Sequence, residues 1–297
     1  MAGWRTVLVT KPCRLSLKNL QLVYEPYEEE RITVPLEDIT VIVLETTQAS
    51  LTAALLSKIA EKNIALFSCD SYHRPNAVFL PFLGHSRVSQ IAYIQQNVSL
   101  PFKKRVWQKI IKSKISNHAQ LLAYCGADNT NVKRLVDQVK SGDRDNLEAY
   151  AARVYWGLLF KKFRRDQKAM DPVNVALNYG YAIVRGAIAR SLVAYGLLPV
   201  FGLFHRSELN AYNLADDLIE PFRVMVDKAV KTLETEDEFE MVMTARTKSL
   251  LLSVLHSEMM LDGELVTLLH ASDVAAKTLV SAMRENDPTL LKLPTFA

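Results

Sequence analysis

The sequence predicts an α+β protein, with a small β-rich N-terminal domain at residues 1–83 and a larger all-α domain at residues 84–297. In the first part, short runs of β-branched and aromatic residues alternate with turn signals, which is typical of strands. In the second part, apolar residues recur every three or four positions, which indicates amphipathic helices. The length of 297 residues allows two domains, and a hydrophobic content of 49% allows each a packed core.

The first domain is expected to form a small sheet covered by one helix. The run Ile39–Leu44 is almost wholly apolar, so this strand should be buried. The spacing of the apolar residues then changes, which predicts a short helix at residues 51–60 that ends before Asn63. Strands are expected at residues 5–10, 20–24, 31–34, 39–44, 64–67 and 76–80.

The second domain is expected to consist of helices. The strongest pattern covers residues 178–195, where Tyr181, Val184 and Ile188 repeat at helical spacing and Gly196 is suited to end the helix. Further helices are expected at residues 87–98, 102–124, 213–233, 245–257 and 263–284, and one is expected to begin near Asp145. Disorder is expected only in short loops and in the C-terminal tail.

Cysteine usage and hydropathy indicate a cytoplasmic protein with no membrane partner. The cysteines are few, odd in number and far apart in the sequence: Cys13, Cys69 and Cys125. Without a C-x-x-C pair a zinc knuckle is not expected, and free thiols fit a reducing compartment. The first residues lack a signal-peptide pattern. The longest apolar stretch, residues 182–204, contains Arg185 and Arg190, which a membrane span would not normally carry unpaired.

One segment has the residue types of a divalent-metal site. His205 is followed closely by three carboxylates, Asp216, Asp217 and Glu220. If residues 213–233 are helical, Asp217 and Glu220 share a face. Carboxylates suit Mg²⁺ and Mn²⁺, and one imidazole favours tolerance of Mn²⁺.

An ordinary amphipathic helix explains the same segment equally simply. An apolar stripe that includes Leu214 and Leu218 would face the core, and the carboxylates would lie on a solvated face with ion pairs such as Glu220–Arg223. Pro221 fits this interpretation poorly, because a proline inside a helix kinks it.

A distant carboxylate, Glu148, has two possible roles. Asp145 and Glu148 have the spacing of a capping box, in which the glutamate reaches back to a backbone amide at the start of the helix. Alternatively, Glu148 contributes a carboxylate to a metal site, which is compatible with a position in a first helical turn.

Two basic clusters are candidates for contact with DNA phosphates. One cluster lies along residues 102–124 and contains Lys103, Lys104, Arg105, Lys109, Lys112 and Lys114. The other contains Lys161, Lys162, Arg164, Arg165 and Lys168. Such clusters are often solvated faces, but two of them beside aromatic residues favour phosphate binding. The sequence carries neither a Walker A motif nor a G-x-G-x-x-G motif, so nucleotide hydrolysis has no support.

Four segments together resemble the CRISPR-associated integrase, the metal-dependent nuclease of spacer acquisition. They are residues 148–153, 177–184, 202–205 and 214–223, and their order and spacing also match. The length and the first residues, Met-Ala-Gly-Trp-Arg, resemble the type II branch of this family most. The resemblance implies an N-terminal dimerisation domain and a helical catalytic domain. It implies that Glu148, His205 and Glu220 are catalytic ligands of Mg²⁺ or Mn²⁺, with Asp217 as a secondary acidic residue.

The resemblance also implies a reaction and an assembly. The 3′-hydroxyl of a captured double-stranded DNA fragment would attack a phosphodiester at the boundary of a CRISPR repeat, which inserts the fragment into the array. A homodimer is implied, and two such dimers would flank a dimer of a small ferredoxin-like acquisition partner as a heterohexamer. The alternatives are a general structure-selective DNA repair nuclease with the same site and a non-catalytic DNA-binding scaffold.

Overall fold

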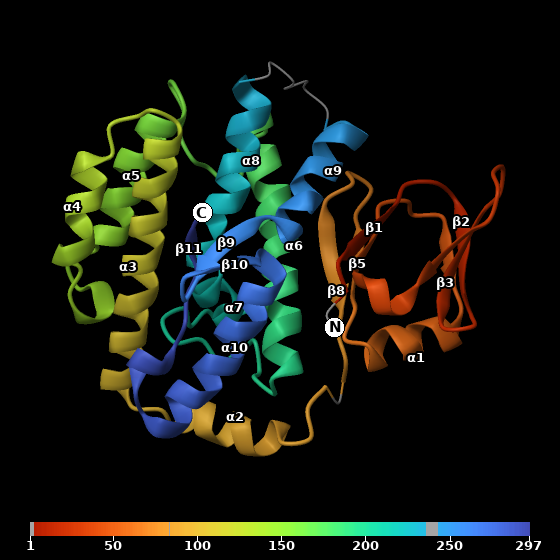
Figure 1. The fold of residues 1–297 in the computed structure, drawn as a ribbon, viewed down its shortest axis with the longest axis horizontal. Coiled ribbons are helices and arrows are strands. Elements are labelled where there is room, and N and C mark those ends of the chain that lie inside the picture. Colours follow the sequence, from red (N-terminus) through yellow and green to blue (C-terminus); the bar gives the residue numbers. More distant parts are fainter. Residues whose placement is uncertain (1–2, 83, 236–242) are drawn as a thin grey trace. The chain divides into compact units, whose positions relative to one another are not determined.

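The computed structural model describes residues 3–82, 84–235 and 243–297 (Figure 1). The chain divides into two compact units. The first comprises Met1–Val88 together with Val193–Gly196, and the second comprises Ser89–Leu192 and Leu197–Ala297. A β-rich first part and a mostly helical second part confirm the predicted fold class. None of the described helices combines the length and the apolar character needed to cross a membrane.

Within the described residues, the first unit holds two four-stranded sheets instead of the single small sheet that was expected. One has the order β1 (Arg5–Val9), β5 (Ile39–Leu44), β7 (Ala65–Cys69), β8 (Pro75–Phe79). The other has the order β4 (Ile32–Pro35), β3 (Gln21–Pro26), β2 (Cys13–Lys18), β6 (Ala49–Leu51). The sequence analysis missed β2 and β6. Strand β2 forms a hairpin with β3 through a turn at Asn19 and Leu20, which both have positive φ, whereas β6 pairs with β2 from a segment more distant in sequence.

The core of the first unit lies where the two sheets and one helix meet. Helix α1 (Ala53–Glu61) begins after Thr52, whose side chain accepts a hydrogen bond from the amide of Leu55. Leu55 packs in one cluster with Ile42 of β5 and Leu15 of β2, and all three side chains are fully buried. Strand β5 pairs in parallel with both β1 and β7, which explains its continuous apolar sequence. A short 3₁₀ helix, η1 (Leu36–Asp38), precedes β5.

The second unit is built around helix α3. Its helices are α2 (Val88–Asn97), α3 (Leu100–Tyr124), α4 (Thr130–Gln138), α5 (Leu147–Leu159), α6 (Pro172–Ala194), α7 (Asn213–Leu218), α8 (Arg223–Thr235), α9 (Ala245–Ser253) and α10 (Leu268–Glu285). Short 3₁₀ helices are η2 (Ser141–Asp143), η3 (Glu220–Phe222), η4 (Val254–His256) and η5 (Pro288–Leu290). Helix α3 contacts α4, α5, α8 and η3, so the long apolar side of α3 is covered by elements from across the unit (Figure 1).

Two predicted helix boundaries are confirmed by their capping geometry. Helix α3 begins after Ser99, whose hydroxyl accepts from the Phe102 amide at 3.3 Å, with Pro101 in the first turn. Helix α6 ends at Ala194, two residues before Gly196, which has a φ of 79°. The following amide, of Leu197, donates to the Leu192 carbonyl at 2.9 Å, which is the closing hydrogen bond of a Schellman motif.

Near the C-terminus, the structure contradicts two expectations. The predicted helix at 263–284 instead starts with a hairpin of β9 (Glu258–Leu261) and β10 (Glu264–Thr267). Asp262 and Gly263 form its turn with positive φ values, as the two central residues of a type I′ turn require. The C-terminal tail is ordered, because β11 (Thr295–Phe296) pairs with β9 and the Phe296 amide donates to the side-chain oxygen of Asn117 at 3.1 Å.

The expected single helix at 213–233 is interrupted at Pro221. Helix α7 ends at Leu218, the 3₁₀ helix η3 contains Glu220 and Pro221, and α8 starts at Arg223. The proline has no amide hydrogen and its ring excludes the normal helical hydrogen bond, so the direction of the side chains changes there. Consequently, Asp217 and Glu220 have different partners.

Candidate functional site

Glu148 projects from the first turn of α5, and the amides of that turn are satisfied by a different residue. The Asp143 carboxylate accepts from the amides of Leu147 and Glu148 at 2.9 and 3.0 Å. The proposed capping box of Asp145 and Glu148 is therefore wrong, since Asp143 provides the cap. The Glu148 side chain is left to accept a hydrogen bond from the ammonium of Lys114 on α3.

Glu220 is buried, with 7% of its surface exposed, so it does not lie on the solvated face that the amphipathic-helix interpretation expected. The Glu220–Arg223 ion pair of that interpretation is present. Its Oε1 accepts from Nε of Arg223 at 3.1 Å, and its Oε2 lies 2.6 Å from Nζ of Lys114. Burial acts to raise the pKa of this carboxyl, but Arg223 and Lys114 outweigh burial and lower the pKa of Glu220 to about 2. Glu220 is therefore a carboxylate at neutral pH.

Lys114 brings Glu148 and Glu220 together, because both carboxylates contact the same nitrogen atom. Among the residues that the structure describes, no three His, Cys, Asp or Glu side chains are arranged to hold a metal ion. The donor set nevertheless fits a divalent cation. Oε2 of Glu220 is buried and lies 2.6 Å from the Lys114 ammonium. Two carboxylates and one imidazole suit Mg²⁺ or Mn²⁺.

His205 lies in the loop between α6 and α7, and Asp217 fixes the orientation of its ring. Nδ1 of His205 is 2.8 Å from Oδ1 of Asp217, which is completely buried. The hydrogen bond to Asp217 outweighs partial burial and raises the pKa of His205, and Glu220 acts in the same direction. With Nδ1 engaged, Nε2 is the nitrogen left for a ligand, as in carboxylate–histidine–metal arrangements.

The Asp217 carboxylate also holds the backbone of this loop. It accepts from the amides of Leu203, Phe204 and His205 at 2.5, 3.1 and 3.0 Å. Both of its oxygens thus accept hydrogen bonds within the protein, and Asp217 fixes both the loop backbone and the His205 ring.

Gly202 permits this close approach of the loop. A Cβ atom at this position would lie 2.2 Å from the carbonyl oxygen of His205 and 3.0 Å from Oδ2 of Asp217. The first distance is too short for any side chain, and the second is a tight contact. The sequence Gly-Leu-Phe-His therefore needs its glycine for packing.

Asp227 of α8 belongs to a buried polar network. Asp227 accepts hydrogen bonds from the hydroxyls of Tyr155, at 2.7 Å, and Tyr181. Burial raises the pKa of Asp227 to about 6, although the two tyrosines oppose this change. The Arg223 guanidinium lies 4.6 Å from the centre of the Tyr181 ring. The network therefore contacts Arg223, which also pairs with Glu220.

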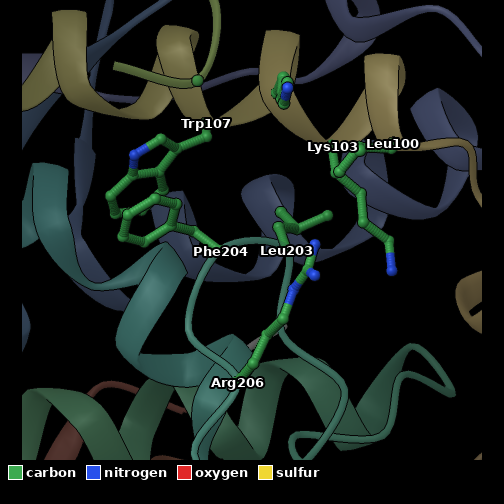
Figure 2. Close-up of a pocket in the computed structure, with 8 residues that line it drawn as sticks. Leu100, Lys103, Trp107, Leu203, Phe204 and Arg206 are labelled. Atoms are coloured by element: carbon green, nitrogen blue, oxygen red, sulfur yellow. The ribbon is translucent and has the colours of Figure 1, made fainter. Parts of the chain in front are cut away.

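A basic pocket of about 330 Å³ lies next to the His205 loop. Figure 2 shows Lys103 from α3 and Arg206 from the loop approaching the same space from opposite sides. The Phe204 ring is half-exposed and stacks on Trp107 with ring centroids 4.2 Å apart. The pocket is lined by Leu100, Lys103, Lys104, Trp107, Gly142, Leu203, Phe204 and Arg206. Cations beside an aromatic ring are suited to bind a nucleic-acid strand.

The predicted DNA-binding residues differ in their availability. Lys109 donates to the carbonyl oxygens of Pro288 and Thr289, at 3.4 and 2.8 Å. Arg165 donates to the side-chain oxygens of Asn174 and Asn178, at 2.7 and 2.6 Å. These two cations have intramolecular partners. The other predicted residues are exposed or half-buried: Lys103, Lys104, Arg105, Lys112, Lys161, Lys162 and Arg164.

Comparison with known proteins identifies the family. The family described as CRISPR associated protein Cas1 matches residues 6–259. The chain belongs to the Cas1 family. The CRISPR-associated endonuclease Cas1 of Neisseria meningitidis serogroup C (strain 8013) is 39% identical over 98% of this chain and 96% of its own length. A Cas1 endonuclease of Pyrobaculum aerophilum is 27% identical over 79% of this chain and 84% of its own length.

Solved structures of Cas1 proteins and of a casposase share the fold. A Cas1 protein from Thermotoga maritima superposes with a TM-score of 0.75 at 16% identity, covering 94% of this chain and 97% of that chain. A casposase bound to its integration product superposes with a TM-score of 0.72 at 19% identity, covering 96% of this chain and 93% of that chain. At these identities the similarity establishes the fold alone.

Sequence reasoning placed Lys114 among the basic residues of α3 but missed its contact with the two carboxylates. A signal was present, because Lys114 follows the buried residues Ile110 and Ile111 by four and three positions and so shares their face of the helix. A lysine on an apolar stripe is seldom buried without an acidic partner. Asp143 carried no such signal, since it lies in η2, before the helix that was predicted to begin near Asp145.

Proposed function

We propose that this Cas1 protein is the metal-dependent integrase and endonuclease of CRISPR spacer acquisition. The strongest support is that Glu148 and Glu220 both contact the ammonium of Lys114. His205 belongs to the same unit, and its Nδ1 is within hydrogen-bond distance of Asp217. The names of its relatives, which include CRISPR-associated endonucleases, support the same activity.

In this proposal Glu148, Glu220 and Nε2 of His205 hold Mg²⁺ or Mn²⁺. A bound divalent cation would polarise the phosphodiester and lower the pKa of the attacking hydroxyl or water. Arg223 keeps Glu220 ionised and oriented, and Asp217 keeps Nε2 of His205 directed to the site. Asp217 is a positioning residue in this scheme.

The proposed reaction joins a DNA fragment to the boundary of a CRISPR repeat. A 3′-hydroxyl forms the new bond to phosphorus, and the bond to the leaving 3′-oxygen breaks. Water in place of the hydroxyl gives strand cleavage. We assign phosphate contacts to the exposed cations of α3 and to Arg206 beside the basic pocket, because they have the charge to hold a strand next to His205.

The test is joining of a labelled double-stranded fragment to a plasmid that carries the cognate repeat, with and without Mn²⁺. Joining should require the metal and should fall sharply in His205→Ala, Glu148→Gln and Glu220→Gln. The double variant Glu148→Gln/Glu220→Gln should be little worse than either single variant, because the ligands act as a unit. Cleavage of branched DNA without repeat-specific joining would instead indicate a repair nuclease. Metal-independent binding without products would indicate a scaffold.

We also propose a cytoplasmic homodimer, formed through residues 1–83, that assembles with a small ferredoxin-like partner as a heterohexamer. Solved structures with a similar fold include Cas6-RT-Cas1–Cas2 complexes, which supports this assembly. Sedimentation of the full chain and of residues 85–297 tests the dimer. A fragment that dimerises as strongly as the full chain would contradict the assignment to residues 1–83.

A further inference from the structure

Lys114 occupies the position between the two carboxylates to which we assign the metal. Its ammonium donates to Oε1 of Glu148 and lies 2.6 Å from Oε2 of Glu220. The lysine is buried, with 7% of its surface exposed. It reaches this point from α3, whereas the carboxylates come from α5 and η3. The contact thus joins three separate elements of the unit.

The charges at this point already balance. Glu148 and Glu220 contribute two negative charges, and Lys114 and Arg223 contribute two positive charges. A divalent cation on the same carboxylates would create an excess of two positive charges at a largely buried position. Like charges repel strongly where water is excluded. Metal and ammonium therefore compete for the same two oxygens.

The two cations at Glu220 differ in how they are held. Arg223 contacts Oε1 of Glu220, and its guanidinium also lies over the Tyr181 ring. Lys114 contacts Oε2 at 2.6 Å from the end of a flexible four-carbon stem. Displacement of Lys114 leaves the Arg223 contact in place, so the ammonium is the group that can yield to a metal.

We propose that Lys114 is a resident counter-cation that a divalent metal must displace, and that it thereby sets the metal affinity of the free protein. This inference rests on the proposed assignment of Glu148 and Glu220 as ligands. Without metal, Lys114 holds two repelling carboxylates together and stabilises the fold. When a metal binds, the Lys114 ammonium must first be displaced, so the metal affinity is lower than that of a site with no internal cation.

The experiment measures Mn²⁺ affinity by calorimetric titration, together with the Mn²⁺-induced shift in melting temperature, on the full chain without DNA. Lys114→Met removes the charge and keeps most of the stem, so it should bind Mn²⁺ about tenfold more tightly than the wild type. Its metal-free melting temperature should fall and its Mn²⁺-induced shift should increase. Lys114→Arg retains a cation and should keep the weaker, wild-type affinity.

Lys112→Met is the matched control for the affinity measurement. Lys112 lies two residues earlier on α3 and is half-buried, so the same charge is removed from the same helix away from the carboxylate pair. Its Mn²⁺ affinity should stay close to that of the wild type. An equal gain in Lys112→Met would overturn the proposal, because the effect would then come from net charge and not from occupancy.

Two further variants separate this proposal from the assignment of the metal site. Glu148→Gln and Glu220→Gln should each abolish the Mn²⁺ response. If they do so while Lys114→Met binds Mn²⁺ no more tightly than the wild type, Lys114 is only a structural ion pair and the displacement proposal fails. If wild type and Lys114→Met both lack a response, the metal assignment fails as well. Lys114→Gln replaces Lys114→Met if the methionine variant does not fold, because glutamine can still donate a hydrogen bond to one carboxylate. It must show the same gain in Mn²⁺ affinity.

Discussion

Nδ1 of His205 lies 2.8 Å from Oδ1 of Asp217, and the same carboxylate accepts hydrogen bonds from three consecutive backbone amides of the His205 loop. One buried side chain therefore sets both the path of the loop and the direction of the imidazole. Carboxylates that orient a histidine in this way act on a metal through the histidine.

Asp217→Asn should weaken Mn²⁺ binding by about 10- to 100-fold, because it removes the charge that orients His205. The pKa of His205 should fall, since the hydrogen bond to Asp217 is the main cause that raises it. Mn²⁺ titration and an NMR titration of the imidazole check both effects. Asp216→Asn is the control: Asp216 lies on the same helix, and its carboxylate pairs with Nε of Arg185 at 2.6 Å. Similar losses in both variants would show that the orienting hydrogen bond is not responsible.

Gly202→Ala should reduce the free energy of unfolding by about 1–3 kcal/mol, because the added Cβ overlaps the His205 carbonyl and crowds Asp217. Chemical denaturation measures the change. Gly157→Ala provides the contrast, since a Cβ at this position in α5 meets nothing within 4 Å. That substitution should stabilise the helix by about 1 kcal/mol. A neutral Gly202→Ala would mean that the loop tolerates the side chain by moving.

Removal of exposed cations on α3 should change the salt dependence of DNA binding. Lys104→Gln and Arg105→Gln should each flatten the slope of log K against log salt concentration, by about 0.7 to 0.9 for every phosphate that the variant no longer neutralises. Lys109→Gln should leave the slope unchanged, because this ammonium already donates to Thr289 at 2.8 Å. Binding measured at several salt concentrations distinguishes them. A normal slope in the Lys104 and Arg105 variants would assign these residues to ordinary solvated surface.

Asp227 should produce a specific pH dependence of stability. Its pKa is raised from 3.8 to about 6, so the folded protein retains a proton that the unfolded chain has already released. The free energy of unfolding should therefore fall as the pH rises through this interval, by up to about 3 kcal/mol. Asp227→Asn has no such titration and should lack that decrease. Denaturation of both proteins between pH 4 and 7 tests this, and parallel curves would contradict it.

The sequence alone determined the fold class, most helices of the second unit and the first-unit strands with a clear apolar pattern. Periodicity is a local property, and the burial of α6 follows directly from residues such as Tyr181 and Ile188 at helical spacing. The end of α6 near Gly196 could be predicted for the same reason, since it depends on a few neighbouring residues. The residue types near His205 likewise indicated metal chemistry.

Only the tertiary structure decided how the carboxylates are used. The sequence indicated that Pro221 does not fit a regular helix, but it could not show that the interruption separates Asp217 from Glu220, or that Asp143 provides the cap and frees Glu148. The contact of Lys114 with Glu148 and Glu220 joins positions far apart in the sequence. A buried charge requires a partner, and the packing of separate elements determines which partner is within reach.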